Sequence, residues 1–166
     1  MYVHRNLVSA VTAWPIDRFN HQKAVSRVAK RPLNMPSRAY MFRHMTWLVE
    51  HTNEFEIWFN SLSSSEQEDV YSSGLLLEQR GPNLRHPMSS GIKGSRHGHM
   101  RELRVQSGGK PLRIFYAFDP RRAAILLIGG DKAGDDRFYV NLVPVADDLY
   151  DTHLQELERE KRDGEP

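Results

Sequence analysis

The sequence predicts an α+β domain in which a small twisted antiparallel sheet packs against helices. Three observations predict this class: two helix-start patterns between residues 53 and 66, three strand-like runs between residues 99 and 130, and a last helical periodicity over residues 136–160. A chain of 166 residues is long enough to bury one substantial core. We therefore expect one folded domain over residues 45–166, preceded by a basic extension over residues 1–44.

The first elements are a short strand over residues 46–52 and a helix that follows it directly. Asn53 lies three residues before Glu56, a spacing typical of a helix N-cap. Apolar side chains then recur at i, i+3, i+4 and i+7, as expected of a helix facing a core: Phe55, Trp58, Phe59 and Leu62. We expect this stripe to be core rather than a ligand site.

A second helix is predicted from a repeated capping pattern. Ser63 and Glu66 have the capping-box spacing, and Gly81-Pro82 ends the helix. The two helices are therefore antiparallel neighbours joined by a tight turn. Residues 82–98 are rich in Gly, Pro and Ser, and we expect them to form a loop.

Three strands are predicted over residues 99–106, 111–118 and 123–130. Gly108-Gly109 is a strong signal for a two-residue hairpin turn between the first two. Strand alternation predicts one apolar face, formed by Leu103, Val105, Leu112, Ile114, Tyr116, Phe118, Ile125 and Leu127. The opposite face is mixed and holds Glu102, Arg104, Gln106, Arg113, Phe115, Leu126 and Ile128. The third strand is apolar on both faces, so we expect it to be central, with residues 46–52 beside it or closing an edge.

The last element is a helix whose apolar side is predicted to hold Leu142, Val145, Leu149, His153 and Leu157. Pro144 cannot donate a helical hydrogen bond, so the helix either starts there or bends there. The predicted order is β-α-α-β-β-β-α.

The predicted hairpin carries an unfavourable pair. A turn at Gly108-Gly109 places Arg104 opposite Arg113, and like charges directly opposite each other destabilise an antiparallel pair. A phosphate bound between two guanidinium groups would remove this cost, because charge-assisted contacts to phosphate are strong. The pair therefore favours a functional interpretation, while pairing of either arginine with Glu102 is the structural alternative.

Charge is strongly uneven along the chain. The net charge is +7 over residues 1–44, −7 over residues 45–79, +8 over residues 80–132 and −6 over residues 133–166, which gives +2 in total. Such blocks indicate a basic face suited to a polyanion beside acidic elements. The absence of cysteine excludes a disulfide scaffold and a thiolate metal site, and fits a reducing cytoplasm. No apolar run is long enough to span a membrane, and no membrane partner is expected.

Several segments resemble a known family. "LRELRV", "LRIFYAFDPRRAAILLIGGDKAGDDRFY" and "VADDLYDTHL" are similar to the phage-derived branch of the RelE/HigB-like toxin superfamily, over about residues 45–160. The resemblance implies a RelE-like fold and the toxin of a type II toxin–antitoxin pair. It implies a ribosome-dependent mRNA interferase that needs no metal or other cofactor and acts in the cytoplasm. The implied partners are mRNA, the ribosome and a cognate antitoxin of helix-turn-helix type, through which alone the toxin would reach an operator DNA.

Metal-free RNA cleavage needs a base for the 2′-hydroxyl, cations for the charged phosphorane and an acid for the leaving 5′-oxygen. Within the resemblance we expect four catalytic residues: Arg104, Arg113, Lys132 and Tyr139. We expect five further residues to bind RNA: Arg101, Arg137, His97, His99 and Lys93. Tyr116 falls on the apolar face and is expected to be core. His97 and His99 have no third ligand at metal-site spacing, so no metal site is expected.

Two alternatives remain at this point. A toxin of the same fold can instead bind a protein target such as gyrase, and a decayed active site would leave only an RNA-binding module. Residues 1–44 lie outside the resemblance, and they are a genuine extension, a transit-like segment or an over-extended start, since Met35, Met41 and Met45 all precede the domain.

Overall fold

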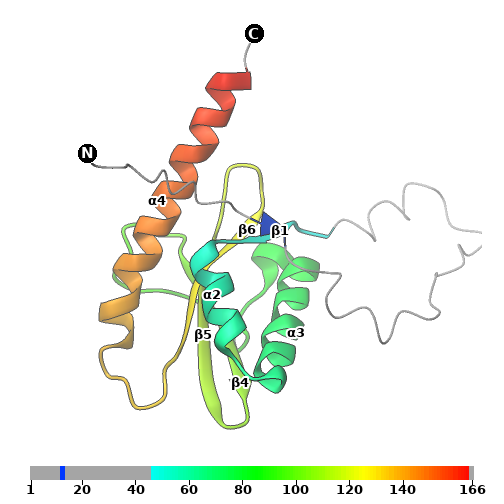
Figure 1. Ribbon diagram of the computed structural model, residues 1–166, viewed down its shortest axis with the longest axis vertical. Helices are drawn as coiled ribbons and strands as arrows, with labels where there is room; N and C mark the ends of the chain where they lie inside the picture. Colours follow the sequence, from blue (N-terminus) through cyan, green and yellow to red (C-terminus); the bar gives the residue numbers. More distant parts are fainter. Residues whose placement is uncertain (1–11, 14–45, 165–166) are drawn as a thin grey trace, which may run out of the picture.

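A mixed β-sheet forms the centre of the protein. In the computed structural model, which describes residues 12–13 and 46–164, six strands pair in the order β1-β2-β6-β5-β4-β3 (Figure 1). The strands are β1 (Thr12–Ala13), β2 (Val49–His51), β3 (Ser89–Gly91), β4 (Arg101–Ser107), β5 (Lys110–Phe118) and β6 (Ala124–Asp131). The predicted α+β class and the three long predicted strands are confirmed.

Helices cover both faces of the sheet. The described helices are α2 (Asn53–Ser61), α3 (Ser64–Arg80), the 3-10 turn η1 (Gly81–Asn83) and α4 (Phe138–Gly164). The hairpin of α2 and α3 packs on one face, α4 packs on the other, and the last turns of α4 run past the sheet (Figure 1). Within the described residues no helix is both long enough and apolar enough to cross a membrane.

The helix caps lie where the sequence predicts them, except that the first N-cap is one residue earlier. Ser63 and Glu66 form the predicted capping box. The first helix is capped by Thr52 rather than by Asn53: the Thr52 hydroxyl accepts a hydrogen bond from the Phe55 amide at 3.2 Å and donates one to a β6 carbonyl. Threonine and asparagine both cap helices well, and the extra bond to β6 favours Thr52.

Two strand pairings differ from the sequence expectation. β2 runs parallel to β6, as Val49 pairs with Ala124, so the sheet is antiparallel only from β6 to β3 and from β1 to β2. The helical hairpin between β2 and the later strands is a crossover connection, which allows a parallel neighbour. Within the predicted loop, Ser89–Gly91 pairs with β4. A strand of Ser-Ser-Gly has no apolar alternation and cannot be recognised from composition.

A register shift between Phe115 and Tyr116 changes which side chains share a face. Tyr116 pairs with Leu126, whereas Phe115 pairs with Ile128. Ile125 and Leu127 therefore lie on the α4 face rather than the predicted face, and Leu126 lies on the face covered by α2 and α3. A β-bulge interrupts alternation, and the uniformly apolar β6 sequence carries no sign of it.

The apolar face of α4 is rotated from the predicted one. Its buried residues are Phe138, Val143, Ala146, Asp147, Tyr150 and His153, while Val145 is exposed. The helix begins at Phe138, so Pro144 lies inside it and does not start it. His153, expected at the boundary, is buried and contacts Asp119 at 3.0 Å.

Two adjacent glycines in β6 let aromatic rings approach the sheet from both sides. A Cβ on Gly129 would lie 2.3 Å from the Trp58 ring, and one on Gly130 would lie 2.8 Å from the Phe138 ring. Trp58 therefore packs on β6 as part of the α2 stripe, as predicted. On the other face, the missing side chain of Gly130 leaves room for the ring of Phe138, the first residue of α4.

The predicted extension lies mostly outside the described residues. Of the described elements, only β1 belongs to it, and Thr12 and Ala13 pair with His51 and Glu50 of β2. The boundary at residue 45 stays a prediction.

Candidate nucleic-acid interface

The opposed arginines are present in the folded protein. Arg104 on β4 pairs with Arg113 on β5, in the register set by the turn at Gly108-Gly109. Both glycines have positive φ angles, 53° and 86°, which suit the two central positions of a hairpin turn. The side chains lie on the face that α4 covers. Arg104 is partly exposed, whereas Arg113 is 7% exposed.

A buried carboxylate lies between the two arginines. Glu102 Oε1 is 3.8 Å from Arg104 Nε and 3.9 Å from Arg113 Nε, so both are ion pairs without a hydrogen bond. The hydrogen bonds of Glu102 come from hydroxyl groups: Ser90 Oγ donates to Oε1 at 2.9 Å, and Tyr139 donates to Oε2 at 2.8 Å. Both arginines therefore pair with Glu102, as the structural alternative expects, but only through ion pairs longer than a hydrogen bond.

Arg113 keeps an unused donor inside this arrangement. Its Nη1 donates to the Leu112 carbonyl at 2.9 Å, but its buried Nε has no hydrogen-bond partner among the described residues. A buried donor without a partner costs about 1–3 kcal/mol. The folded protein therefore contains a buried guanidinium donor whose near charged neighbour, Glu102, lies beyond hydrogen-bond distance.

Tyr139 joins this cluster to the first turn of α4. Burial raises the pKa of the Tyr139 hydroxyl, and the hydrogen bond to Glu102 raises it further, while Arg113 opposes the shift. The hydroxyl is therefore protonated at neutral pH and able to donate a proton. The Lys132 ammonium lies 5.4 Å from the centroid of the Tyr139 ring, a cation–π contact. Phe138, seated on Gly130, holds the helix start against β6.

The four residues predicted to be catalytic are thus brought together. We call them and their two hydrogen-bonding neighbours the Glu102 cluster, which consists of Ser90, Glu102, Arg104, Arg113, Lys132 and Tyr139. The sequence reasoning missed Ser90 and Glu102 as members. Glu102 could have been found, since alternation places it on the same face as Arg104. Ser90 could not, because nothing in the sequence marks β3 as a strand.

Arg101 lies on the opposite face of the sheet. Its Nε contacts Ser89 Oγ and the Tyr116 hydroxyl, both at 3.2 Å, and its Nη2 donates to the Leu84 carbonyl at 3.1 Å. Tyr116 is fully buried in the core, as expected. Arg101 therefore stabilises the interior on the α3 side and does not share a surface with the Glu102 cluster.

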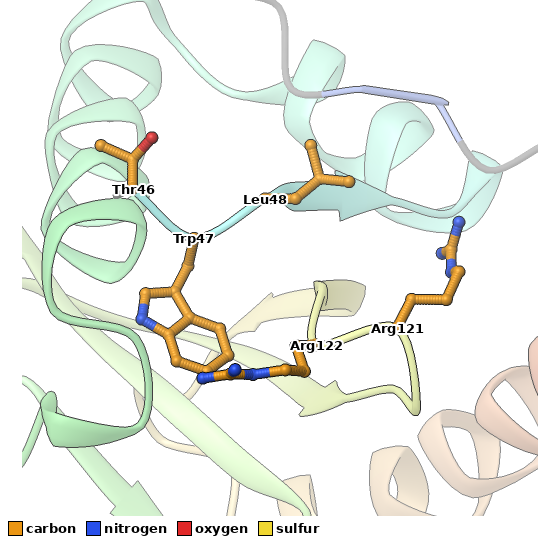
Figure 2. A pocket seen from close by; sticks show the side chains of 5 residues that line it. All are labelled: Thr46, Trp47, Leu48, Arg121 and Arg122. Atoms are coloured by element: carbon orange, nitrogen blue, oxygen red, sulfur yellow. The ribbon is translucent and has the colours of Figure 1, made fainter. Parts of the chain in front are cut away.

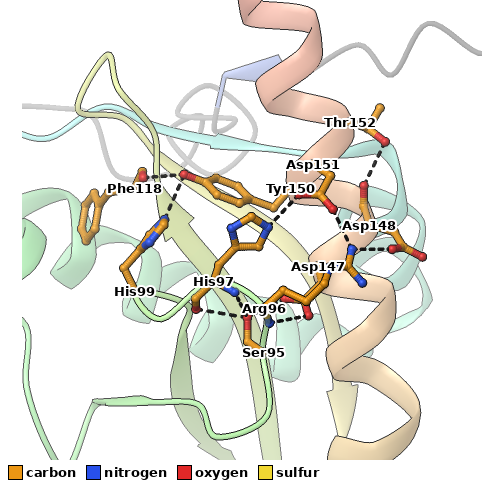
Figure 3. Close-up of polar contacts among 10 residues, drawn as sticks. All are labelled: Ser95, Arg96, His97, His99, Phe118, Asp147, Asp148, Tyr150, Asp151 and Thr152. Carbon is orange, nitrogen blue, oxygen red and sulfur yellow. Dashed lines mark hydrogen bonds and ion pairs between the residues drawn. The ribbon is translucent and has the colours of Figure 1, made fainter.

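The two histidines contact α4 (Figure 3). His97 Nε2 lies 2.8 Å from Asp151 Oδ1, and His99 Nε2 lies 3.1 Å from the hydroxyl of Tyr150. In the same loop, Arg96 pairs with Asp151 at 2.6 Å as well as with Asp148. The Arg96 hydrogen bond, helped by His97, holds the pKa of Asp151 below its usual range although partial burial opposes the shift.

The backbone of the same loop is also fixed. The Ser95 hydroxyl and the Arg96 amide donate to the two carboxylate oxygens of Asp147, the latter at 2.9 Å (Figure 3). Residues 95–99 are therefore clamped onto α4, which makes a direct RNA contact by His97 and His99 less favourable than predicted. Lys93 and Arg137 are exposed outside the cluster. No group of three or more His, Asp or Glu side chains in the described ranges is arranged to hold a metal ion.

A separate pocket of about 360 Å³ lies at the β5–β6 turn and is lined by Thr46, Trp47, Leu48, Arg121 and Arg122 (Figure 2). Arg121 pairs with Glu50 and Asp119. Arg122 has a φ of 70° and places its guanidinium 4.8 Å from the Trp47 ring. Both arginines are thus used to attach residues 46–50 to the turn.

The protein is a three-layer α+β domain. Its basic and aromatic side chains gather where β4, β5 and the C-terminal helix meet. This agrees with the fold that the RelE/HigB-like resemblance implies. The family model described as "Phage derived protein Gp49-like (DUF891)" matches residues 57–151, more than half of the chain, and the chain belongs to this family. The predicted resemblance is therefore confirmed.

Two curated proteins of Mycobacterium tuberculosis strain H37Rv are similar to the chain. "Putative toxin HigB2" is 40% identical over 106 residues, which are 63% of this chain and 53% of that protein. "Putative toxin HigB3" is 43% identical over 95 residues, which are 57% of this chain and 82% of that protein. The chain thus matches about half the length of the first relative and most of the second.

Proposed function

We propose that the protein is the toxin of a toxin–antitoxin pair and acts as a metal-independent endoribonuclease on ribosome-bound mRNA in the cytoplasm. The observation that carries this proposal is the Glu102 cluster, which combines two opposed arginines, a lysine and a protonated tyrosine on one face. The similarity to two proteins named as HigB toxins supports the toxin assignment. The partner proposed to neutralise it is a protein antitoxin of helix-turn-helix type.

The chemistry proposed for the cluster is attack of an RNA 2′-oxygen on the adjacent phosphorus, with loss of the 2′ proton to solvent water and departure of the 5′-oxygen as a hydroxyl group. Negative charge accumulates on the phosphorane oxygens, where preorganised cations lower the barrier. Arg104, Arg113 and Lys132 would supply that charge, and the unused Nε donor of Arg113 is suited to a phosphoryl oxygen. The Tyr139 hydroxyl carries its proton at neutral pH, and we propose that it redirects this proton from Glu102 to the leaving oxygen.

The exposure of the cluster differs from residue to residue. Arg104 is partly exposed and Lys132 and Tyr139 are partly buried, so RNA would reach the cluster from their side while Arg113 forms its floor. The Arg113 side chain is 8% exposed against 34% for Arg104. We infer that the phosphate contacts Arg104 first and Arg113 more deeply.

The test is mRNA cleavage by the full chain, mapped by primer extension with and without ribosomes. The comparison is between the unchanged protein, Arg104→Gln and the control Arg159→Gln, which removes an equal charge from an exposed position on α4. We expect cleavage only with ribosomes, its loss in Arg104→Gln and its retention in Arg159→Gln. Growth inhibition in cells without any cleavage would favour a protein target such as gyrase, and binding of RNA without either would indicate a non-catalytic module.

A further inference from the structure

The Glu102 carboxylate is an unexpected neighbour for a phosphate. It is buried, at 5% exposure, and it lies on the face where the arginine pair would hold a negatively charged group. A carboxylate near bound phosphate weakens binding by repulsion. Its presence inside the proposed site therefore needs an explanation beyond relief of the repulsion between two arginines.

The way Glu102 is held leaves the arginine donors free of it. Its hydrogen bonds come from two neutral hydroxyls, those of Ser90 and Tyr139, on elements that flank the sheet centre. Its distances to the two Nε atoms, 3.8 and 3.9 Å, exceed hydrogen-bond length. Glu102 thus contributes charge to the arginine pair without occupying the N–H groups that would bind a phosphoryl oxygen.

The formal charges of Arg104, Arg113 and Glu102 can be added to give the net charge at this point of the sheet. Two guanidinium groups and one carboxylate leave a net charge of +1 at the point where the two strands face each other. Lys132 adds its charge further out, over the ring of Tyr139. A phosphodiester carries one negative charge, which matches +1, whereas a terminal phosphate carries close to two at neutral pH because its second pKa is about 6.

We propose that Glu102 determines specificity: it tunes the arginine pair to the singly charged phosphodiester inside an RNA chain and against doubly charged terminal phosphates such as those of free nucleotides. The inference rests on the proposed function, since it takes the arginine pair to be a phosphate site. Without Glu102, a pair of charge +2 would suit a dianion, and free nucleotides would compete with RNA.

The experiment measures binding rather than cleavage. Isothermal titration calorimetry at pH about 7.5, above the second phosphate pKa, compares two probes on the full chain: a deoxydinucleotide with one phosphodiester and no terminal phosphate, and a deoxynucleoside 5′-monophosphate. Neither probe has a 2′-hydroxyl, so neither can be cleaved. The measured quantity is the ratio of the two affinities.

We expect Glu102→Gln to move this ratio toward the monophosphate by about tenfold, since the substitution adds one net positive charge close to the ligand. Ser90→Ala, which removes a hydrogen bond to the same carboxylate and keeps its charge, should leave the ratio within about twofold. Arg104→Gln should move the ratio the opposite way, toward the diester, because it removes one positive charge.

An unchanged ratio in Glu102→Gln would overturn the proposal. A Glu102→Gln protein that does not fold would overturn it too, because the amide has nearly the same shape, and its oxygen can accept from one hydroxyl while its NH2 group donates to the oxygen of the other. If the protein cleaves RNA but the affinity ratio is unchanged in Glu102→Gln, the specificity role of Glu102 is wrong and the proposed nuclease function stands. If the ratio shifts but RNA is not cleaved, the nuclease function is wrong and the specificity role stands. If neither probe binds, both proposals are wrong.

Discussion

The hydroxyl of Tyr139 donates a hydrogen bond to Glu102 Oε2 at 2.8 Å, and this single contact joins the first turn of α4 to β4. The two residues are separated by 37 positions in the sequence and by two intervening strands in the chain. The contact places a proton donor beside the arginine pair and fixes the carboxylate between the two guanidinium groups.

Tyr139→Phe should abolish growth inhibition and lower stability. The substitution keeps the ring but removes a donor from the buried carboxylate of Glu102, which costs about 1–3 kcal/mol. The matched control is Tyr150→Phe, which removes another buried tyrosine hydroxyl, one that donates to the Phe118 carbonyl at 2.8 Å. Chemical denaturation and a growth assay should show both variants less stable and only Tyr139→Phe inactive. Retained toxicity in Tyr139→Phe would show that the Tyr139 hydroxyl is not the proton donor.

The two opposed arginines should differ in their effect on folding. The sequence alone predicts that either can be replaced without loss of stability, but the structure limits this to the partly exposed Arg104. Arg104→Gln should change the free energy of unfolding by less than about 1 kcal/mol. Arg113→Gln leaves the buried Glu102 with one ion pair, that to Arg104 at 3.8 Å, and should cost about 3 kcal/mol. Urea melts of both variants test this, and equal effects would show that burial does not separate the two roles.

Gly129→Ala should destabilise the fold through the α2 stripe. The added Cβ would lie 2.3 Å from the Trp58 ring, so the ring or the strand must move, at about 1–3 kcal/mol. Gly91→Ala on edge strand β3 is the control, because a Cβ there meets no atom within 4 Å. Thermal melting of both variants is the measurement. Trp58→Ala, which empties the same contact, should cost about 3–5 kcal/mol, and a smaller loss would mean that the stripe contributes less than its packing indicates.

Acid should weaken the protein through Glu66. The hydrogen bond from Lys110, followed by those from the Ser63 amide and hydroxyl, lowers the pKa of Glu66 from 4.5 to about 2. The unfolded chain takes up this proton first, so the stabilisation is present above pH 4.5 and is lost as the pH falls from about 4.5 to 2. Urea midpoints measured from neutral pH down to about pH 2.5 should fall less steeply in Glu66→Gln than in the unchanged protein. Glu68→Gln, exposed on the same helix, is the control for the loss of one negative charge.

A chain that begins at Met45 should retain the fold. The predicted capping patterns, periodic stripes and family-like segments all begin after that residue, and β1 adds only the pairs of Thr12 and Ala13 to the sheet edge. Comparing the melting temperatures of the full and shortened chains is the test. A large drop would show that the extension belongs to the core.

The fold was predictable wherever side-chain pattern and backbone agree. The hairpin turn at Gly108-Gly109 sets the register of β4 against β5, and that register alone is enough to place Arg104 opposite Arg113. The bulge beside Phe115 was not predictable, since β6 is apolar on both sides and tolerates either register. The strand at Ser89–Gly91 was hidden because its stability comes from backbone pairing with β4 and from the Ser89 contact with Tyr116.

The candidate site is a set of cations and a tyrosine that the sequence proposes, but the tertiary contacts among these side chains were not predictable. Arg101 belongs to the same basic run as Arg104, and strand alternation alone is enough to place it on the opposite face. RNA binding by His97 and His99 stays a prediction, and the long-range contacts that both residues make with α4 were not visible in the sequence. Those contacts join segments more than 50 residues apart, a distance over which local pattern carries no information.

The position of Tyr139 at the start of α4 also bears on how the protein is made. β4 and β5, with Glu102 and both arginines, leave the ribosome before α4 does, and translation proceeds at about 5–20 residues per second. The cluster lacks its tyrosine, and the clamp on Asp147 and Asp151 cannot close, until α4 has emerged and docked. Under the proposed function, a nascent chain therefore lacks the complete cluster until translation is nearly finished, and it would not cleave the mRNA on the ribosome that is making it.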